Sequence, residues 1–501
     1  MLGIDYLSGW SIAFAAGLVF LSVLRKAFTP PRELAHLPLV PVWSSFWITL
    51  TTRGFEEFYD LAAPILIAKG ICLVYDLLCS WLILKQAWRY GQWNILLGRA
   101  EDVHRIFNES NDFPKLLLTE RIPNTKVADF IGDNIIYSNG EDWKRHRKSV
   151  NKFFKKQWET RPIIEMTNIL ICEWEKICDK PISVHNWTER LTLDILGLVL
   201  FGLEFNGLSD GKGKVVTLYV QTVSFVYKFL YVAFPFLDKF RKKEIAVIDE
   251  YEAMIDNYIE SRTAALKEGN INPEADALTA MISANNREEN LLSKKELKNT
   301  FKMLFLAGHD TTATTLSGIL YHLSINQEIQ DKLRREIISS LGVNGPISPS
   351  EEIVKEMPYL TRVIRESLRL LPPVAIDIER ENNSVVQFQG YTIPPHSNIQ
   401  AHIWHLHREP LYWTNPESFN PERFNPENEK DWGKYWVPFI TGTRQCLGLN
   451  LAMLELKICL TMIIHKFSVS WPKDKPQTPL PLGPVELIYP KELDLCFTPR
   501  Y

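Results

Sequence analysis

The sequence predicts a mainly helical fold with small β-sheets. From about residue 50 onward, apolar residues recur with helical spacing, and helical patterns dominate the middle of the chain. The longest is an apolar helix from Leu304 to about Leu323, whereas strand candidates are few and short, such as Trp93–Leu97. Since no repeat or boundary between globular units is evident, we expect one large globular domain over residues 51–501.

Charge and cysteine content narrow the classes of function. The net charge is −3, so the sequence gives no electrostatic reason to expect a nucleic acid as partner. The seven cysteines are scattered, without the paired spacing of a structural zinc site, and this suits a reducing compartment.

An uncharged, largely apolar run lies near the N-terminus, from Leu7 to Leu24. As a helix it would span about 27 Å, close to the roughly 30 Å hydrocarbon core of a bilayer. A cleaved signal peptide is the alternative, but its charge would precede the apolar run, whereas the basic pair Arg25–Lys26 follows it. We therefore expect residues 1–28 to form a retained single-pass anchor. Only Asp5 is charged ahead of the run, so the positive-inside rule puts the remaining chain in the cytosol.

A proline-rich stretch follows the predicted anchor, over residues 29–50. Its prolines at positions 30, 31, 38 and 41 oppose helix formation and stiffen the chain. We expect a non-helical connector at which the chain turns from the membrane to the globular domain.

The most informative stretch runs from Phe439 to Gly448 and contains Cys446. Glycines on both sides of the cysteine permit close approach of a large group, and the donors of Thr443–Gln445 can stabilise a thiolate. Helix-forming residues continue from Leu449 to Leu460, which puts Cys446 at or just before a helix N-terminus. An inert core thiol is the alternative for any single cysteine.

The predicted helix 304–323 contains residues that are poor choices for a buried helix. Ala307 and Thr311 share one face, Gly308 permits a groove or a kink, and Asp310 adjoins Thr311 as an acid–alcohol pair. Such a conflict with local propensity indicates a functional site. A seam of small residues for helix packing is the alternative.

Two further motifs place charged side chains on helix faces. Trp143 and Arg147 have the spacing of one face, although an ordinary basic surface patch has it too. Glu366 and Arg369 can form a bidentate pair before prolines end their helix, and Arg423 is a candidate third member. The pair alone is weak evidence because many exposed helices carry one.

Taken in order, these motifs resemble those of the cytochrome P450 superfamily. The segment from Phe439 to Gly448 resembles its haem-ligand loop, and Ala307–Thr312 is similar to its Ala-Gly-x-Asp-Thr-Thr sequence. The resemblance covers about residues 30–500 and implies the mainly helical P450 fold with a small side sheet, joined here to an N-terminal transmembrane helix.

The resemblance implies a cofactor, haem b (iron protoporphyrin IX), with Cys446 as axial thiolate and metal ligand. The cofactor-binding residues that it implies are Cys446, Trp143, Arg147, Ala307, Gly308, Arg380, Phe439 and Arg444. Trp143, Arg147 and Arg380 would meet the propionates. Asp310 and Thr311 would be the catalytic pair that delivers protons to bound dioxygen. Glu366, Arg369 and Arg423 would lock the haem-side core.

The activity implied by the resemblance is that of a membrane-anchored, microsomal-type monooxygenase of the endoplasmic reticulum. It would insert one oxygen atom from O2 into a lipophilic molecule such as a steroid, terpenoid, fatty acid or xenobiotic. The sequence contains no Gly-rich dinucleotide loop, so electrons are expected from NADPH-cytochrome P450 reductase, with cytochrome b5 as a second candidate donor. A basic face at Lys144, Arg145 and Lys148 is a candidate docking surface. A P450-fold isomerase or dehydratase and a non-enzymatic haem-binding protein are the alternatives.

The pocket walls implied by the resemblance are residues 116–138, 205–240, 374–378 and 482–488. The aromatic segment Phe225–Phe236 is expected to roof the pocket and meet the bilayer, with ordinary core as the alternative. Asp377 is expected to pair with Arg380, the alternative being a polar group of the substrate. His402 and His405 lack a suitable third ligand, so a metal site there is rejected.

Overall fold

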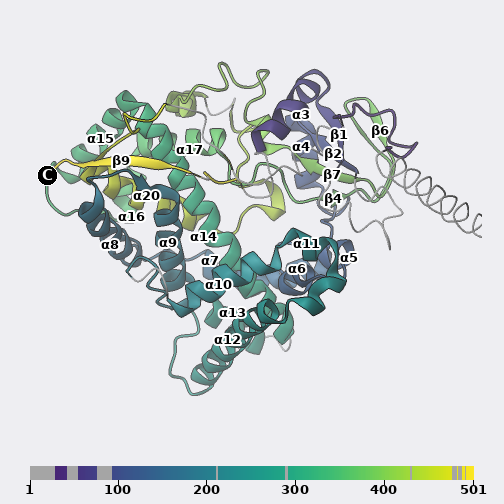
Figure 1. Ribbon diagram of the computed structural model, residues 1–501, viewed down its shortest axis with the longest axis horizontal. Coiled ribbons are helices and arrows are strands. Elements are labelled where there is room, and N and C mark those ends of the chain that lie inside the picture. Colours follow the sequence, from purple (N-terminus) through teal and green to yellow (C-terminus); the bar gives the residue numbers. More distant parts are fainter. Residues whose placement is uncertain are drawn as a thin grey trace, which may run out of the picture.

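The computed structural model describes residues 29–41, 55–75, 93–209, 213–287, 291–428, 432–476, 482, 488–490 and 492–501. The predicted anchor, residues 1–28, lies outside this part, as does much of the connector. No helix of the described part is long and apolar enough to cross a bilayer. Helices dominate and the strands form small sheets (Figure 1), so the predicted fold class is confirmed.

The helices and strands are as follows. The α-helices are α3 (Phe55–Lys69), α4 (Ala100–Asn108), α5 (Leu118–Arg121), α6 (Lys126–Ile131), α7 (Gly140–Phe154), α8 (Arg161–Ile177), α9 (Val184–Leu196), α10 (Lys214–Val226), α11 (Phe229–Ala233), α12 (Lys242–Lys267), α13 (Ala277–Arg287), α14 (Lys294–Ile325), α15 (Gln327–Leu341), α16 (Glu351–Lys355), α17 (Pro358–Leu370), α18 (Ile403–Leu406) and α20 (Leu449–Lys466). Shorter helical turns are η2 (Gly197–Phe201), η3 (Pro235–Phe240), η4 (Pro421–Phe424), η5 (Pro426–Asn428) and η6 (Gly442–Arg444). The strands are β1 (Ile71–Tyr75), β2 (Trp93–Leu97), β3 (Ile182–Ser183), β4 (Arg380–Glu381), β5 (Val386–Phe388), β6 (Tyr391–Ile393), β7 (Asn398–Ala401), β8 (Phe467–Ser470) and β9 (Asp494–Pro499).

The largest sheet of the described part has four strands in the order β1-β2-β7-β4. The predicted strand Trp93–Leu97 is its β2, which is buried throughout and pairs in parallel with β7. Figure 1 shows this sheet beside α3 and α4 at one end of the molecule, with α8, α15, α16 and α20 grouped at the other end. An isolated bridge between Lys115 and Arg380 extends the sheet toward α5. The sheet thereby fixes two cations that become important at the site.

Helix α14 runs through the core, and most of its length is buried. It begins at Lys294, well before the predicted start at Leu304, because Ser293 and Glu296 form a capping box there. Its first turns carry lysines, which interrupt the apolar pattern from which the helix was predicted. Lys302, for example, is buried and donates a 2.6 Å hydrogen bond to Glu252 of α12. The predicted boundary was therefore wrong, whereas the predicted helix is present.

The aromatic segment Phe225–Phe236 begins at the end of α10, continues through α11 and ends within η3. It is partly core near its start, since Val226 is buried. Its end faces outward, with Phe236 66 % exposed, and Phe240, which follows it in η3, is 73 % exposed. An ordinary core helix cannot account for that exposure, so the alternative of a buried segment fails for η3.

Candidate active site

Cys446 lies in the loop between η6 and α20, three residues before the first residue of that helix. Its backbone N–H donates to the carbonyl of Phe439 at 3.0 Å, which closes the loop. Gly442 adopts a φ of +73°, and a side chain there would meet the Phe107 carbonyl at 3.1 Å. This glycine is therefore required by a close approach of the loop to α4. The predicted position of Cys446 just before a helix N-terminus is confirmed.

The Cys446 thiol has a mixed environment. Cys446 as a whole residue is exposed to solvent, yet burial by the surrounding protein raises the pKa of its thiol. The N–H of Gly448, the Arg147 guanidinium and the N–H of Leu449 act in the opposite direction and stabilise the thiolate. An exposed cysteine whose thiolate is stabilised by two backbone N–H groups and a nearby guanidinium is suited to bind a large electrophilic group.

Cys459 is the contrasting thiol among the six cysteines of the described part. It is buried inside α20, and its sulfur lies 3.2 Å from the hydroxyl of Thr167. Burial raises its pKa, and no cation offsets that effect. Cys459 therefore fits a structural thiol, and Cys446 fits a ligand.

Trp143 and Arg147 lie one turn apart on α7, as their spacing predicts. The Arg444 guanidinium lies 4.7 Å from the centre of the Trp143 ring. Arg444 also donates to the carbonyls of Ile136 and Ser138, both at 2.8 Å. Burial and the nearby Arg380 lower the pKa of Arg444 to about 9. The loop that carries Cys446 is thus fastened to the segment that leads into α7.

Arg380 is a buried arginine with one unsatisfied nitrogen. Its Nε donates to Asp377 Oδ2 at 3.1 Å and its Nη1 to the Phe113 carbonyl at 3.3 Å. The Nη2 is buried and has no partner within the described part. The predicted pairing of Asp377 with Arg380 is therefore present. A buried guanidinium nitrogen without an acceptor calls for a ligand that supplies one.

Lys115 is a further buried cation at the same place, and no sequence motif singled it out. Burial lowers its pKa to about 7, and Asp377 opposes that effect. The charges of Arg380 and Arg444 also act on Lys115. Three buried cationic side chains, Lys115, Arg380 and Arg444, thus interact with one carboxylate, that of Asp377. Such an excess of buried positive charge is costly without anions, and the two carboxylates of haem would supply them. The residues present therefore fit the cofactor.

The motif residues of α14 separate into two groups. Ala307, Asp310 and Thr311 are partly exposed, and the Thr311 hydroxyl donates to the Ala307 carbonyl at 3.0 Å. Asp310 does not bond to Thr311 but lies 2.7 Å from Nε2 of His309. At Gly308, a side chain would meet Leu196 of α9 at 2.5 Å. Because glycine has no side chain, α9 packs closely against α14 at this position. The alternative of a small-residue seam for helix packing predicts this contact.

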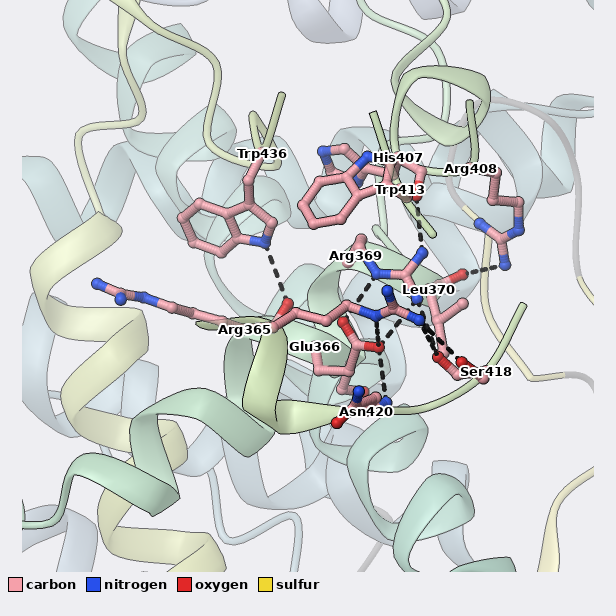
Figure 2. Close-up of polar contacts among 12 residues, drawn as sticks. Arg365, Glu366, Arg369, Leu370, His407, Arg408, Trp413, Ser418, Asn420 and Trp436 are labelled. Atoms are coloured by element: carbon pink, nitrogen blue, oxygen red, sulfur yellow. Dashed lines mark hydrogen bonds and ion pairs between the residues drawn. The ribbon is translucent and has the colours of Figure 1, made fainter. Parts of the chain in front are cut away.

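Glu366 is held between two arginines (Figure 2). Arg369 donates to its two oxygens at 2.8 and 2.9 Å, and Arg423 donates at 3.2 Å. The backbone N–H of Asn420 adds a bond of 2.8 Å. Arg369 also donates to the His407 carbonyl at 2.8 Å. The predicted three-member network is confirmed, and it ties α17 to α18 and η4.

The histidines near α18 have separate structural partners. His405 lies 2.9 Å from Glu409 through Nε2, and its backbone N–H donates to His402 at 3.3 Å. His407 accepts the backbone N–H of Val437 at 2.9 Å. These bonds give the three rings a role in packing the loop before η4.

Salt bridges already compensate part of the predicted basic face on α7. Lys144 pairs with Glu141 at 2.6 Å, and Arg145 pairs with Asp142 and Glu296 at 2.7 and 2.8 Å. The predicted basic face therefore has a smaller net positive charge than its lysine and arginine residues alone would give it.

An apolar cavity of about 310 Å³ lies between α12, α14 and the segment at Phe205. Phe301 and Phe305 line it from α14. These residues are on a different face of the helix from Ala307 and Thr311. The cavity is consequently not the space next to the acid–alcohol pair.

The fold and site define a mainly helical protein with an exposed cysteine on a loop before a helix and a cluster of buried cations that suits a dicarboxylate cofactor. A family model described as cytochrome P450 matches residues 86–497. The chain belongs to the cytochrome P450 family. It is a monooxygenase that uses haem b with an axial cysteine thiolate.

Individual relatives agree with this assignment. Cytochrome P450 3A2 of Rattus norvegicus is 30 % identical and aligns with 74 % of this chain and 76 % of its own length. Cytochrome P450 monooxygenase xanG of Aspergillus fumigatus is 26 % identical over 89 % of this chain and 84 % of its own length. The crystal structure of the cytochrome P450DA heme domain has a TM-score of 0.78 and 21 % identity, covering 93 % of this chain and 98 % of that one, so it supports the fold.

Proposed function

We propose that this protein is a membrane-anchored haem-thiolate monooxygenase with Cys446 as the axial ligand. It inserts one atom of O2 into a lipophilic small molecule, such as a steroid, terpenoid, fatty acid or xenobiotic. The observation that carries the proposal is the exposed Cys446 thiol beside an excess of buried cations. A thiolate ligand favours O–O cleavage by the bound haem iron, which is the chemistry that this reaction needs.

The other site residues hold the cofactor and direct protons. Trp143, Arg147 and Arg380 face the cofactor's carboxylates together with Lys115. Arg444 and Phe439 keep the Cys446 loop in place, supported by their bonds to backbone groups. Thr311 and Asp310 deliver protons at the partly exposed face of α14, beside Ala307.

The electrons come from a separate NADPH-cytochrome P450 reductase at the endoplasmic reticulum, with cytochrome b5 as a second donor. Residues 1–28 supply a single membrane anchor and leave the catalytic domain, residues 51–501, in the cytosol. The reasons are the apolar run Leu7–Leu24 and the lack of a dinucleotide-binding loop in the sequence.

The proposal is tested by reconstitution of the haem-loaded protein with reductase, NADPH and a panel of lipophilic compounds under ¹⁸O2. We expect a product that contains one ¹⁸O atom and whose formation stops without oxygen. An isomerase or dehydratase would form product without oxygen, and a non-enzymatic haem protein would form none. Either result would contradict the proposal.

Replacement of Thr311 by alanine should keep haem and substrate binding but raise the share of NADPH that ends as hydrogen peroxide several-fold. The reason is that the proposal assigns proton delivery to the Thr311 hydroxyl, on the partly exposed face of α14. Thr315→Ala is the matched control, because the Thr315 hydroxyl also donates to a helix carbonyl one turn earlier, Thr311 O at 2.8 Å, but Thr315 is buried. Peroxide and product are quantified against NADPH consumed. Equal coupling in both variants would remove Thr311 from proton delivery.

Deletion of residues 1–28 should abolish stable membrane insertion and leave a folded, haem-loaded domain that still binds liposomes reversibly. The exposed rings of Phe236 and Phe240 would support that residual binding. Replacing both by serine in the truncated protein should weaken sedimentation with liposomes several-fold. Leu411→Ser is the control, since Leu411 is equally exposed, at 68 %, outside the aromatic segment. Equal loss in the control would assign the binding to general hydrophobicity.

A further inference from the structure

His309 occupies the variable position between Gly308 and Asp310 of the α14 motif, and it is buried. Its Nδ1 lies 2.9 Å from the carbonyl of Phe305, one turn earlier in the helix. Its Nε2 lies 2.7 Å from Oδ1 of Asp310. The ring of Tyr219 from α10 packs edge-on against it at 5.2 Å between ring centres. Both ring nitrogens are therefore engaged.

The hydrogen count of these contacts requires an extra proton. A carbonyl only accepts, so Nδ1 of His309 must carry a hydrogen and donate to Phe305. In a neutral ring Nε2 would then be an acceptor facing an ionised carboxylate, which is also an acceptor. The 2.7 Å contact is satisfied only if a proton sits between them, on the ring or on Asp310. The pair thus binds one proton more than a neutral histidine beside an ionised aspartate.

We propose that His309 and Asp310 form a dyad that stores one exchangeable proton beside Thr311 and supplies it during turnover. The inference rests on the proposed function, because it assigns a source to the protons that Asp310 and Thr311 deliver. The shared proton moves from Nε2 of His309 to the Asp310 carboxylate, and Asp310 releases it from its carboxyl oxygen toward the reacting oxygen. This leaves an ionised Asp310 beside a neutral His309 that keeps its Nδ1–H, and a solvent proton then restores the Nε2–H. No electron is transferred in these steps.

The surroundings favour the protonated dyad. Burial alone would lower the pKa of His309, but the Asp310 carboxylate and the Phe305 carbonyl outweigh it and raise that pKa. The charge of Glu189 on α9 acts on the ring in the same direction. Tyr219 is the titratable neighbour from α10, and burial holds its pKa well above the usual 10, so it stays neutral.

The dyad is partly open to the site. The Asp310 side chain is 25 % exposed, whereas that of His309 is 5 % exposed. The proton is consequently stored on the buried side and released on the exposed side of one helix. Thr311 is the next residue along the helix and is also partly exposed.

A first test measures the pH dependence of stability and needs no turnover. The variant is His309→Gln in the haem-loaded ferric protein, because glutamine can still donate to Asp310 but holds no proton that titrates near neutral pH. Since the folded-state pKa is raised, the stability due to the proton is fully present below the unfolded value of about 6.5 and is lost as pH rises through the folded value. The difference in Tm between wild type and variant should therefore shrink from about pH 6.5 upward.

His322→Gln is the matched control for that measurement. His322 is a second buried histidine of α14, bonded to Ser367 at 3.1 Å, and burial lowers its pKa to about 3. It is neutral when folded, so its difference in Tm should be constant above about pH 6.5 and should not shrink. Parallel curves for the two variants would overturn the stored proton.

A second test follows coupling in the reconstituted enzyme. His309→Gln should raise the peroxide share of NADPH consumption several-fold, as Thr311→Ala does, with haem content and substrate affinity unchanged. Restoration of full coupling by glutamine would reduce His309 to a residue that only positions Asp310 and would overturn the proposal. If the wild type itself forms no oxygen-dependent product, the proposed function fails instead, and the stability measurement still decides whether the dyad holds a proton.

Discussion

Replacement of Cys446 by alanine should abolish oxygen-dependent turnover and the red-shifted Soret band of the reduced protein under carbon monoxide. Both need a thiolate on the iron, and Cys446 is the described cysteine that combines an exposed sulfur with backbone and Arg147 donors at its base. The measurement is a pair of absorption spectra and the turnover assay described above.

Cys459→Ala is the control for this experiment. Cys459 lies only a few turns along α20 but is buried against Thr167. Its replacement should lower the free energy of unfolding by about 1 kcal/mol and leave the spectrum unchanged. A thiolate band that survives in Cys446→Ala and disappears in Cys459→Ala would transfer the ligand role to the other cysteine.

Replacement of Glu366 by alanine should cost about 3–5 kcal/mol of folding free energy, because it leaves the buried Arg369 guanidinium without its carboxylate. Arg423 and the Asn420 N–H would lose the same acceptor. The loss is a large fraction of the roughly 5–15 kcal/mol by which a typical domain is stable, so the haem-loaded protein is expected in low yield. Urea unfolding followed by circular dichroism measures the effect.

Glu141→Gln is the control for the effect of Glu366. Glu141 and Lys144 form a charge pair with the same i, i+3 spacing, but both side chains are mostly exposed. Exposed pairs contribute little, so this variant should unfold at the same urea concentration as wild type. An equally small change for Glu366→Ala would show that the network of Figure 2 does not hold the core.

Local patterns accounted for the parts of the site that lie within one turn or one loop. Cys446 ahead of a helix, the Trp143–Arg147 face and the Glu366–Arg369 pair all follow from short spacings in the sequence. The helical period and the loop glycines dictate these arrangements whatever the rest of the chain does. The mainly helical class likewise follows from periodicity summed over many segments.

Features that depend on contacts between distant segments could not be predicted. Lys115 becomes part of the site because a strand bridge brings it beside Arg380, and no spacing relates the two. The motif leaves the position of His309 unspecified, and only the structure places the Phe305 carbonyl at its Nδ1 and Asp310 at its Nε2. The start of α14 at Lys294 was not predicted, because the charge of Lys302 is compensated by Glu252 of α12. A hydropathy pattern registers the charge of a lysine but contains no information about the side chain that pairs with it.

The crowding of cations around Asp377 also bears on how long the protein survives before it is loaded. Lys115, Arg380 and Arg444 come from three separate stretches of chain, and their charges repel one another. Without haem, this repulsion destabilises the contacts between these stretches and favours their local opening. Haem binds the form in which these stretches are packed together. By mass action it lowers the population of the locally opened form, which proteases can cleave. The abundance of this enzyme in a cell would then follow the supply of haem as well as the rate of its synthesis.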